Sequence, residues 1–258
     1  MNAAALFLVT HGSSDRRSWL VLQDLVSVTR SVAQSGDSDR LIGGGCLEGQ
    51  PLSLAQQLEQ FANEVIDCGG SEIVILPLFL LEGVHVSEDI PAEVAIAQSK
   101  LQERFPDQPD QLIFRTTAHL GTHSQIPNLI LQQFEKYTEN KIKSPHEPER
   151  HEPERQARIL IAHGSRRAGA NQVVEDLAKQ SHAIAAYWGV EPKIETQIEQ
   201  LIAQGVYKIN VLPYFLSEGS ITEAIAKKLQ PYSDIAQIQQ LPVPLSSEQI
   251  TNLLLEFV

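Results

Sequence analysis

Cysteine is scarce in this chain: its 258 residues include only Cys46 and Cys68, which form no Cys-x-x-C pair. Two cysteines are too few for a disulfide-stapled scaffold or a cluster held by cysteine alone, and they fit a reducing compartment. Long hydrophobic runs are also missing. The longest, residues 73–81, has nine residues and contains Pro77, whereas a membrane-spanning helix needs roughly 18. No basic region precedes the apolar start, so we expect a cytoplasmic protein without an export signal or transmembrane helix.

Basic residues are outnumbered, because 20 Lys and Arg stand against 32 Asp and Glu, for a formal net charge of −12. This balance disfavours nucleic acid as a partner, since phosphate binding depends on a concentrated basic face. The excess of acidic over basic residues is unevenly distributed along the chain. Residues 1–139 carry 8 basic and 18 acidic side chains, a balance of −10, whereas residues 140–258 carry 12 and 14, a balance of −2.

The sequence repeats itself. Hydrophobic residues make up 42% and charged residues 20% of the chain, as in ordinary globular proteins, and its length corresponds to about 1.7 average domains. Leu8–Ser13 reappears in similar form as Leu160–Ser165, and residues 73–83 match residues 209–219 at 7 of 11 positions. We therefore predict two similar domains, at 1–139 and 157–258.

Residues 140–156 are predicted to link the two copies. They contain Ser144-Pro145 and two tandem His-Glu-Pro-Glu-Arg units, with no apolar side chain to anchor these units. Such a composition is typical of a solvated linker. His146 and His151 could collect a metal ion, but the solvated interpretation is favoured because each precedes Glu-Pro in a charged run.

Short β-rich runs alternate with longer amphipathic runs, which is typical of βα units around a mainly parallel sheet. We expect strands at 6–10, 40–44, 72–78 and 111–116, and in the second copy at 158–162, 208–213 and 237–241. From the histidine of His-Gly-Ser to the proline of Leu-Pro there are 66 residues in the first copy and 50 in the second. The predicted fold is α/β, with two similar open, mainly parallel-sheet domains, the second one trimmed.

Three candidate site residues follow strand ends in the first copy: His11, Glu48 and His85. Open parallel sheets bind ligands outside the carboxyl ends of their strands. Two imidazoles and a carboxylate suit a divalent first-row metal, and neutral histidine can act as a base at about pH 7. Each residue also has a structural interpretation, as part of a tight turn, a solvated loop or a helix cap, respectively. Their common edge favours the functional one.

The second copy keeps only part of this set. His163 repeats His11, but Ile221 stands where His85 is expected, and Glu191 is the nearest candidate for Glu48. We predict one intact and one degenerate copy. Whether His163 contributes is open.

The candidate residues lie in three segments, namely Val9-Thr10-His11-Gly12-Ser13, Cys46-Leu47-Glu48, and the run from Leu76-Pro77-Leu78-Phe79-Leu80 through Gly83-Val84-His85 to Asp89-Ile90-Pro91. Together they resemble the class II tetrapyrrole chelatases, specifically the sirohydrochlorin chelatases of sirohaem and cobalamin biosynthesis. The resemblance covers essentially the whole chain. It implies a tandem fusion of two chelatase units facing one another across a cleft, and hence a pseudo-dimeric monomer.

This resemblance implies an enzyme, a lyase-type metal chelatase that inserts Fe(II) or Co(II) into sirohydrochlorin and releases two protons. It implies no organic cofactor and no ATP. His11 and His85 match the family's metal-binding and base histidines, and Glu48 matches its acidic partner. The choice between iron and cobalt is open, because both ions suit a His and carboxylate site. A rival interpretation is a non-enzymatic metal carrier or tetrapyrrole-binding protein on the same duplicated fold.

Arginines follow the first loop of each copy. Arg16 and Arg17 come after His11, and Arg166 and Arg167 come after His163. Guanidinium groups can bind the carboxylates of the substrate in bidentate fashion, so we predict substrate binding here, although exposed arginine pairs can also be merely solvated.

Three further histidines are less specific. His119 and His123 form His-x-x-x-His, but the glutamate of the zinc motif is missing and Gly121 interrupts any helix. We expect them in a loop before a helix that starts at about Pro127, with a place on the cleft rim left open. His182 is predicted to lie in an amphipathic helix as a structural residue.

Overall fold

The computed structural model describes residues 4–35, 40–106, 111–139 and 155–257. The chain divides into two compact units, one made of Met1–His123 with Leu245–Val258 and the other of Ser124–Pro244. His146 and His151, in the predicted linker, lie outside the described residues. None of the described helices is both long and apolar enough to cross a membrane.

The first unit is built on four parallel strands in the order β2-β1-β3-β4. These are β1 (Ala5–Gly12), β2 (Ile42–Glu48), β3 (Glu72–Pro77) and β4 (Ile113–Thr116). Strand β2 starts and ends later than the predicted 40–44. Its pairing with β1 continues to the Gly12 and Glu48 partners, so Glu48 is the last residue of the strand rather than a residue beyond it.

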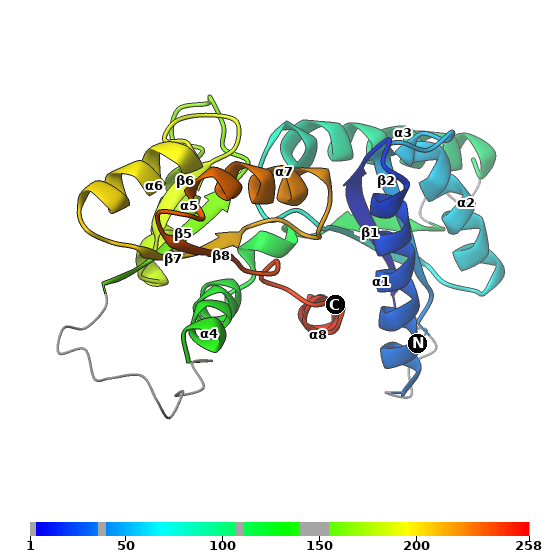
Figure 1. The fold of residues 1–258 in the computed structure, drawn as a ribbon. Coiled ribbons are helices and arrows are strands. Elements are labelled where there is room, and N and C mark those ends of the chain that lie inside the picture. The colour runs from blue at the N-terminus through cyan, green and yellow to red at the C-terminus, as the bar shows by residue number, and fades with distance from the viewer. Residues whose placement is uncertain (1–3, 36–39, 107–110, 140–154, 258) are drawn as a thin grey trace. The chain divides into compact units, whose positions relative to one another are not determined.

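Helices cover both faces of this sheet (Figure 1). They are α1 (Arg16–Ser35), α2 (Leu54–Asp67), α3 (Ile90–Arg104) and α8 (Ser247–Leu255). Ala5, Phe7 and Val9 of β1 lie in one core cluster with the buried residues of α2 and α3. A side chain at Gly44 would strike Leu22 and Val26 of α1, whereas one at Gly43 would strike Phe61 of α2. Successive β2 residues therefore face α1 and α2 in turn, as strand geometry requires.

Side chains of the two flanking helices cover part of the free edge of β2. Arg30 of α1 donates to the Ile42 carbonyl at 2.7 Å. The Gln57 amide of α2 accepts from Cys46 N at 3.1 Å and donates to Cys46 O at 2.9 Å. The backbone groups of an uncovered edge strand can pair with strands of other chains. These side-chain contacts satisfy the Ile42 carbonyl and both backbone groups of Cys46. A cavity of about 430 Å³ lies beside β2 between α1 and α2.

The second unit repeats the same topology in the order β6-β5-β7-β8. Its strands are β5 (Gln156–Ala162), β6 (Ile184–Tyr187), β7 (Lys208–Pro213) and β8 (Gln237–Gln240), and its helices are α4 (Ile126–Glu139), α5 (Gln172–Gln180), α6 (Ile194–Ala203) and α7 (Ser220–Leu229). The prediction of two similar, parallel-sheet α/β domains is confirmed. That they face one another across a cleft stays a prediction.

The second copy differs from its prediction at two places. Its second strand, the four-residue β6, was not predicted. His182 does not lie within a helix, because α5 ends at Gln180 and His182 has φ 55°. The left-handed His182 turns the chain directly from α5 into β6. Because this turn and the four-residue strand are both short, hydrophobic periodicity did not reveal them.

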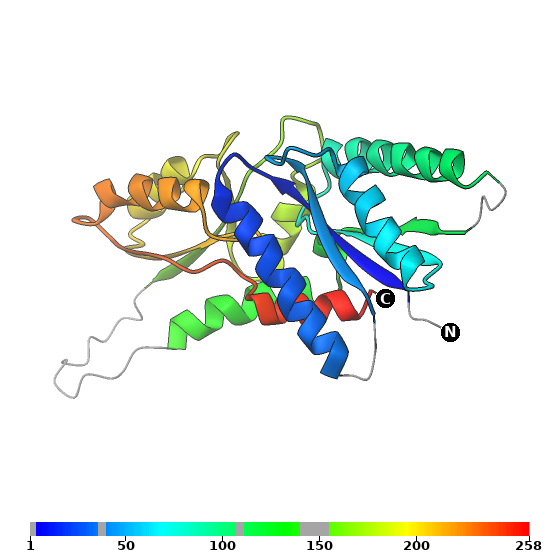
Figure 2. The same ribbon diagram turned by 90° about the vertical axis from the view of Figure 1, so that its right-hand side faces the viewer.

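The last helix of each half of the chain belongs to the compact unit of the other half. Helix α4 falls in the second unit, where Arg158 lies over the Phe134 ring at 5.4 Å. Helix α8 falls in the first unit and packs beside α1 (Figure 2). The compact units thus differ from the predicted division into consecutive halves, 1–139 and 157–258, because each last helix buries its apolar face in the other unit.

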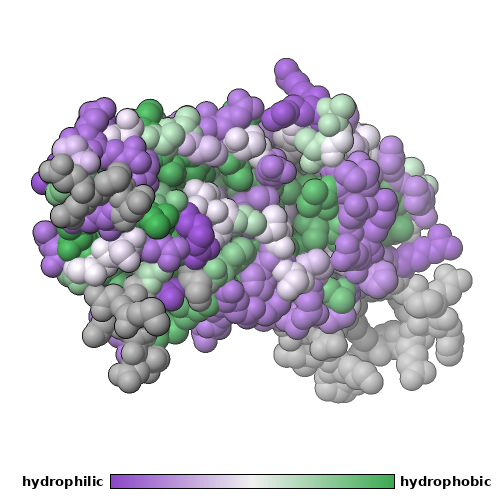
Figure 3. Space-filling view, turned by 180° about the vertical axis from the view of Figure 1, so that it is seen from behind, coloured by the Kyte–Doolittle hydropathy of each residue, from purple (hydrophilic) through white to green (hydrophobic). Residues whose placement is uncertain are grey.

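Hydrophilic side chains surround the hydrophobic patches on the face drawn in Figure 3.

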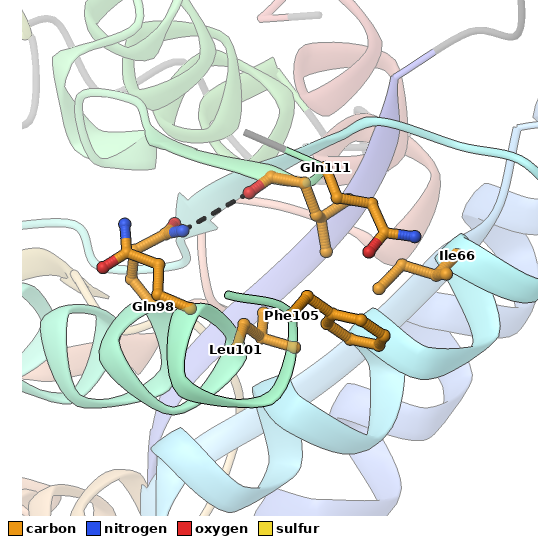
Figure 4. A pocket seen from close by; sticks show the side chains of 7 residues that line it. Ile66, Gln98, Leu101, Phe105 and Gln111 are labelled. Carbon is orange, nitrogen blue, oxygen red and sulfur yellow. Dashed lines mark hydrogen bonds between the residues drawn. The ribbon is translucent and has the colours of Figure 1, made fainter. Parts of the chain in front are cut away.

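Inside the first unit, a cavity of about 10 Å³ lies between α2, α3 and the start of β4 (Figure 4). The buried Gln111 Oε1, which lines it, has no hydrogen-bond partner within the described ranges. A space of this size holds about one water molecule, and such a water would satisfy the amide oxygen.

A buried hydroxyl pair joins α1 to α8. Thr29 and Thr251 are both fully buried, with their Oγ1 atoms 3.2 Å apart. Thr251→Val should lower the free energy of unfolding by about 1–3 kcal/mol, because it leaves the Thr29 hydroxyl buried without its partner. Thr29→Val with Thr251→Val should recover most of this loss in urea unfolding. Simple addition of the two single effects would contradict the pairing.

Candidate functional site

His11 stands where β1 turns away from the sheet. The following residue, Gly12, has φ 80°, and a side chain there would come within 2.0 Å of the Glu48 carbonyl oxygen. Glycine is therefore required at position 12 for two reasons, namely the left-handed backbone and the close approach of β2. This tight contact fixes the backbone beside His11. The His11 ring is exposed, and its Nδ1 lies 2.8 Å from Gly12 O.

His85 opens a single π-helical turn, His85–Asp89, that leads into α3. Such turns occur frequently at functional sites. His85 Nδ1 lies 2.7 Å from Asp89 Oδ2, four residues on. This contact with a carboxylate orients the ring, as it commonly does for catalytic or metal-binding histidines. His85 makes no side-chain bond that caps the helix, so the capping interpretation is wrong.

The two imidazoles meet. His11 Nε2 lies 2.9 Å from His85 Nε2, and the rings stand edge to face with centroids 4.3 Å apart. In each ring Nδ1 faces an oxygen, which is satisfied when Nδ1 carries the proton of the neutral imidazole. Both Nε2 atoms then present lone pairs to each other, an arrangement that a shared proton or a metal cation stabilises. Tetrahedral coordination with bonds of about 2.1 Å would place the nitrogens about 3.4 Å apart, so a small widening would admit an ion.

Glu48 occupies the edge of the sheet beside Gly12, but it does not join the two histidines in a compact ligand set. Across the described ranges, no three His, Cys, Asp or Glu side chains lie together so that they could hold an ion. The structure thus brings together two of the three predicted residues. The role of Glu48 stays a prediction.

Asp89 is a site residue that was not among the predicted candidates, although it stands in the third of the segments quoted above, and its contact with His85 Nδ1 was not predicted. The signal available was its spacing of four residues from His85, which places two side chains on one helical face. Cys46 also lies close by. Its thiol donates to the Glu48 carbonyl at 3.1 Å, and burial raises the pKa of the thiol.

The predicted substrate arginines follow the His-Gly-Ser turns. Arg16 and Arg17 begin α1, and Arg17 forms an ion pair with Asp15 at 2.7 Å. The Arg17 guanidinium holds the pKa of the Asp15 carboxyl below its ordinary value. Arg166 and Arg167 lie in the turn after β5. Substrate binding by these four residues stays a prediction.

The second copy repeats the turn without the histidine pair. Gly164 has φ 79°, and His163 Nδ1 lies 3.1 Å from its carbonyl, as in the first copy. Ile221, at the position matching His85, instead packs against the core of this unit. Glu191 accepts a hydrogen bond from Lys193 N at 2.8 Å at the start of α6. Its role is therefore structural in this geometry, and the second copy lacks the paired imidazoles.

His119 and His123 do not form a metal pair. His119 Nδ1 lies 2.9 Å from the Phe79 carbonyl, and His123 Nε2 lies 3.2 Å from Glu256 Oε2. The loop prediction is confirmed, since a short 3₁₀ turn, Leu120–Thr122, precedes α4 at Ile126.

Comparison with known proteins decides the family. A family model described as CbiX matches residues 5–137 and 157–254. The chain belongs to the CbiX family. The resemblance to sirohydrochlorin chelatases, predicted from the three segments, is thereby confirmed as a family relationship.

Solved structures share the fold of this CbiX-family chain. SirB from Bacillus subtilis with Fe3+ has a TM-score of 0.72 and 17% identity, covering 100% of this chain and 94% of its own. A structure of CbiX described as the terminal enzyme of sirohaem biosynthesis in denitrifying bacteria has a TM-score of 0.65 and 18% identity, covering 98% and 99%. At these identities the similarity concerns the fold.

A curated relative of this CbiX-family chain is the sirohydrochlorin cobaltochelatase of Priestia megaterium. It is 24% identical over 172 residues, which are 64% of this chain and 51% of the relative. The chain thus spans about half the length of the curated relative.

Gly12→Ala tests the contact that fixes His11. Gly169 is the matched control, because its φ is 78° and nothing lies within 4 Å of an added side chain. Gly169→Ala should cost only the left-handed backbone penalty of about 1–2 kcal/mol. Gly12→Ala should cost clearly more in urea unfolding, because it also displaces the Glu48 backbone. Equal losses would show that the close approach is unimportant.

Proposed function

We propose that this chain inserts Fe(II) or Co(II) into sirohydrochlorin, with release of two protons, in sirohaem or cobalamin biosynthesis. The observation that carries the proposal is the convergence of the His11 and His85 Nε2 atoms at 2.9 Å. Membership of the CbiX family supports it. The proposed reaction uses neither ATP nor an organic cofactor, as the resemblance to the class II chelatases implies.

The two imidazoles suit the handling of the metal substrate. The ion must bind strongly enough to lose water and weakly enough to pass to the ring nitrogens. Two neutral nitrogen ligands leave coordination positions open for those nitrogens, whereas a closed four-ligand cage would retain the ion. The His85 side chain is 39% exposed, so a large planar substrate can reach the site edge.

The same residues suit the removal of the pyrrole protons. An imidazole whose Nδ1 carries the proton has a free Nε2 that can act as a base. Asp89 accepts from His85 Nδ1 and stabilises the imidazolium formed after proton uptake. His11 and His85 would therefore hold the metal substrate through their Nε2 atoms. As the ion passes to the ring nitrogens, the freed Nε2 atoms would accept the two pyrrole protons, with Glu48 as a further acidic group at the same edge.

His85→Ala should slow metal insertion by about 100-fold or more, because proton transfer by a positioned side chain contributes about 10²–10⁴-fold. His11→Ala should behave similarly. The assay mixes the purified protein with sirohydrochlorin and Co(II) or Fe(II) and follows the absorption spectrum of the ring. His182→Asn is the control, because His182 is exposed and asparagine tolerates its φ of 55°.

Parent-like insertion by His85→Ala would refute the site. Tight metal binding by the parent without any insertion would favour the rival metal carrier. Rates measured for both ions in one assay assign the preferred metal.

The arginines should act on substrate affinity rather than on the chemical step. Arg16→Ala and Arg166→Ala should each raise KM for sirohydrochlorin by about 10- to 100-fold, which corresponds to the loss of about 1.5–3 kcal/mol expected for one charge-assisted hydrogen bond. The kcat should stay near that of the parent, which steady-state kinetics would show. Lys179→Ala is a suitable control, because Lys179 is an exposed cation on α5 that pairs with Asp176. Unchanged KM values would remove these residues from the substrate site.

A further inference from the structure

His119 packs against the segment that leads to His85. This segment runs from the end of β3 at Pro77 to the start of the π-helical turn at His85, and residues 78–83 within it have no regular secondary structure. An irregular segment of this kind supplies few backbone bonds of its own. The position of His85 therefore depends on what holds the segment from outside.

The Phe79 carbonyl, in the middle of this segment, is held from the loop after β4. His119 Nδ1 lies 2.9 Å from this oxygen, and Gly121 N donates to it, also at 2.9 Å. A side chain at Gly121 would come within 1.9 Å of the Leu80 carbonyl oxygen. The two loops are thus packed backbone against backbone. The Phe79 ring in turn lies 6.4 Å from the His85 ring.

The imidazole itself is built into this contact. His119 is only 9% exposed, and a buried polar ring is costly unless its polar atoms are used. Thr122 Oγ1 donates to the His119 carbonyl at 2.7 Å. One turn on, His123 Nε2 contacts Glu256 Oε2 at 3.2 Å, which joins this loop to the C-terminal end of α8. His119 is therefore immobilised from several sides.

We propose that His119 is a positioning residue for His85, acting through its Nδ1–H donation to the Phe79 carbonyl. The hydrogen bond holds the segment so that His85 Nε2 faces His11 Nε2. The inference rests on the proposed function for its activity readout. It gives the first histidine of the His-x-x-x-His pattern a role that is neither metal binding nor contact with substrate.

Three substitutions distinguish the effect of losing the His119 hydrogen bond from the effects of changed side-chain volume and of lower stability. His119→Asn keeps a donor, because the asparagine Nδ2 lies about where imidazole Nδ1 does. His119→Leu removes the donor and keeps an apolar side chain in the buried site. His182→Asn applies the histidine-to-asparagine change at an exposed residue. Each protein is measured for kcat, for KM of sirohydrochlorin, and for melting temperature.

The direct readout is the spectrum of 15N-labelled histidine rings in the protein without substrates. We expect His119→Leu to shift the ring signals of His85 and His11 and to leave those of His163 unchanged. We expect kcat to fall about 10- to 100-fold, the loss that a misplaced catalytic group of about 1 Å produces, with little change in KM. His119→Asn should restore both the signals and most of kcat.

Two results would overturn the proposal. One is parent-like kcat and His85 signals in His119→Leu. The other is a lower kcat with unchanged His85 signals, since His119 would then act through general stability. Failure of the proposed function looks different, because His85→Ala itself would then keep the parent rate, while the ring signals would still report whether His119 positions His85.

Discussion

Parallel pairing of β1 with strands on both sides is the constraint on which the site depends. Gly12 is the partner of Glu48 on β2, and Val9 is the partner of Pro77 on β3. Since all three strands run in the same direction, their carboxyl ends meet at one edge of the sheet. Hydrophobic burial along β1, whose residues from Ala5 to Val9 are almost fully buried, holds that arrangement. The two candidate histidines, His11 and His85, therefore emerge beside each other although 74 residues separate them.

The two copies share the scaffold, but only the first carries the histidine pair. The strand order is the same in the two units, and Gly12 and Gly164 adopt the same left-handed conformation. The second histidine differs, because Ile221 packs against the core of the second unit where the first copy carries the half-buried His85 imidazole. An apolar side chain there adds to the buried surface of the second unit. The second copy therefore has the turn that carries His163 but no second imidazole from position 221 beside it.

The first unit places its acidic side chains beside the cations and imidazoles of the site. Asp89 orients His85, and Asp15 pairs with Arg17. The excess of acidic residues in the first half thus includes specific contacts as well as a general negative field. Such a field attracts a divalent cation and repels a carboxylate-rich ring. In the proposed function, local contacts such as those of the arginines must therefore recognise the ring.

The sequence by itself determined the duplication, the α/β class, and the end of β1 and the segment after β3 that carry His11 and His85, because motifs and hydrophobic periodicity are local properties of the chain. It could not determine that Asp89 holds the His85 ring or that His119 holds the Phe79 carbonyl. It also did not show that α8 packs beside α1 and α4 lies in the second unit. Periodicity identifies the apolar face of a helix but not the surface that covers it. Only tertiary structure decides which groups distant in sequence meet, because those contacts arise when the whole core is packed.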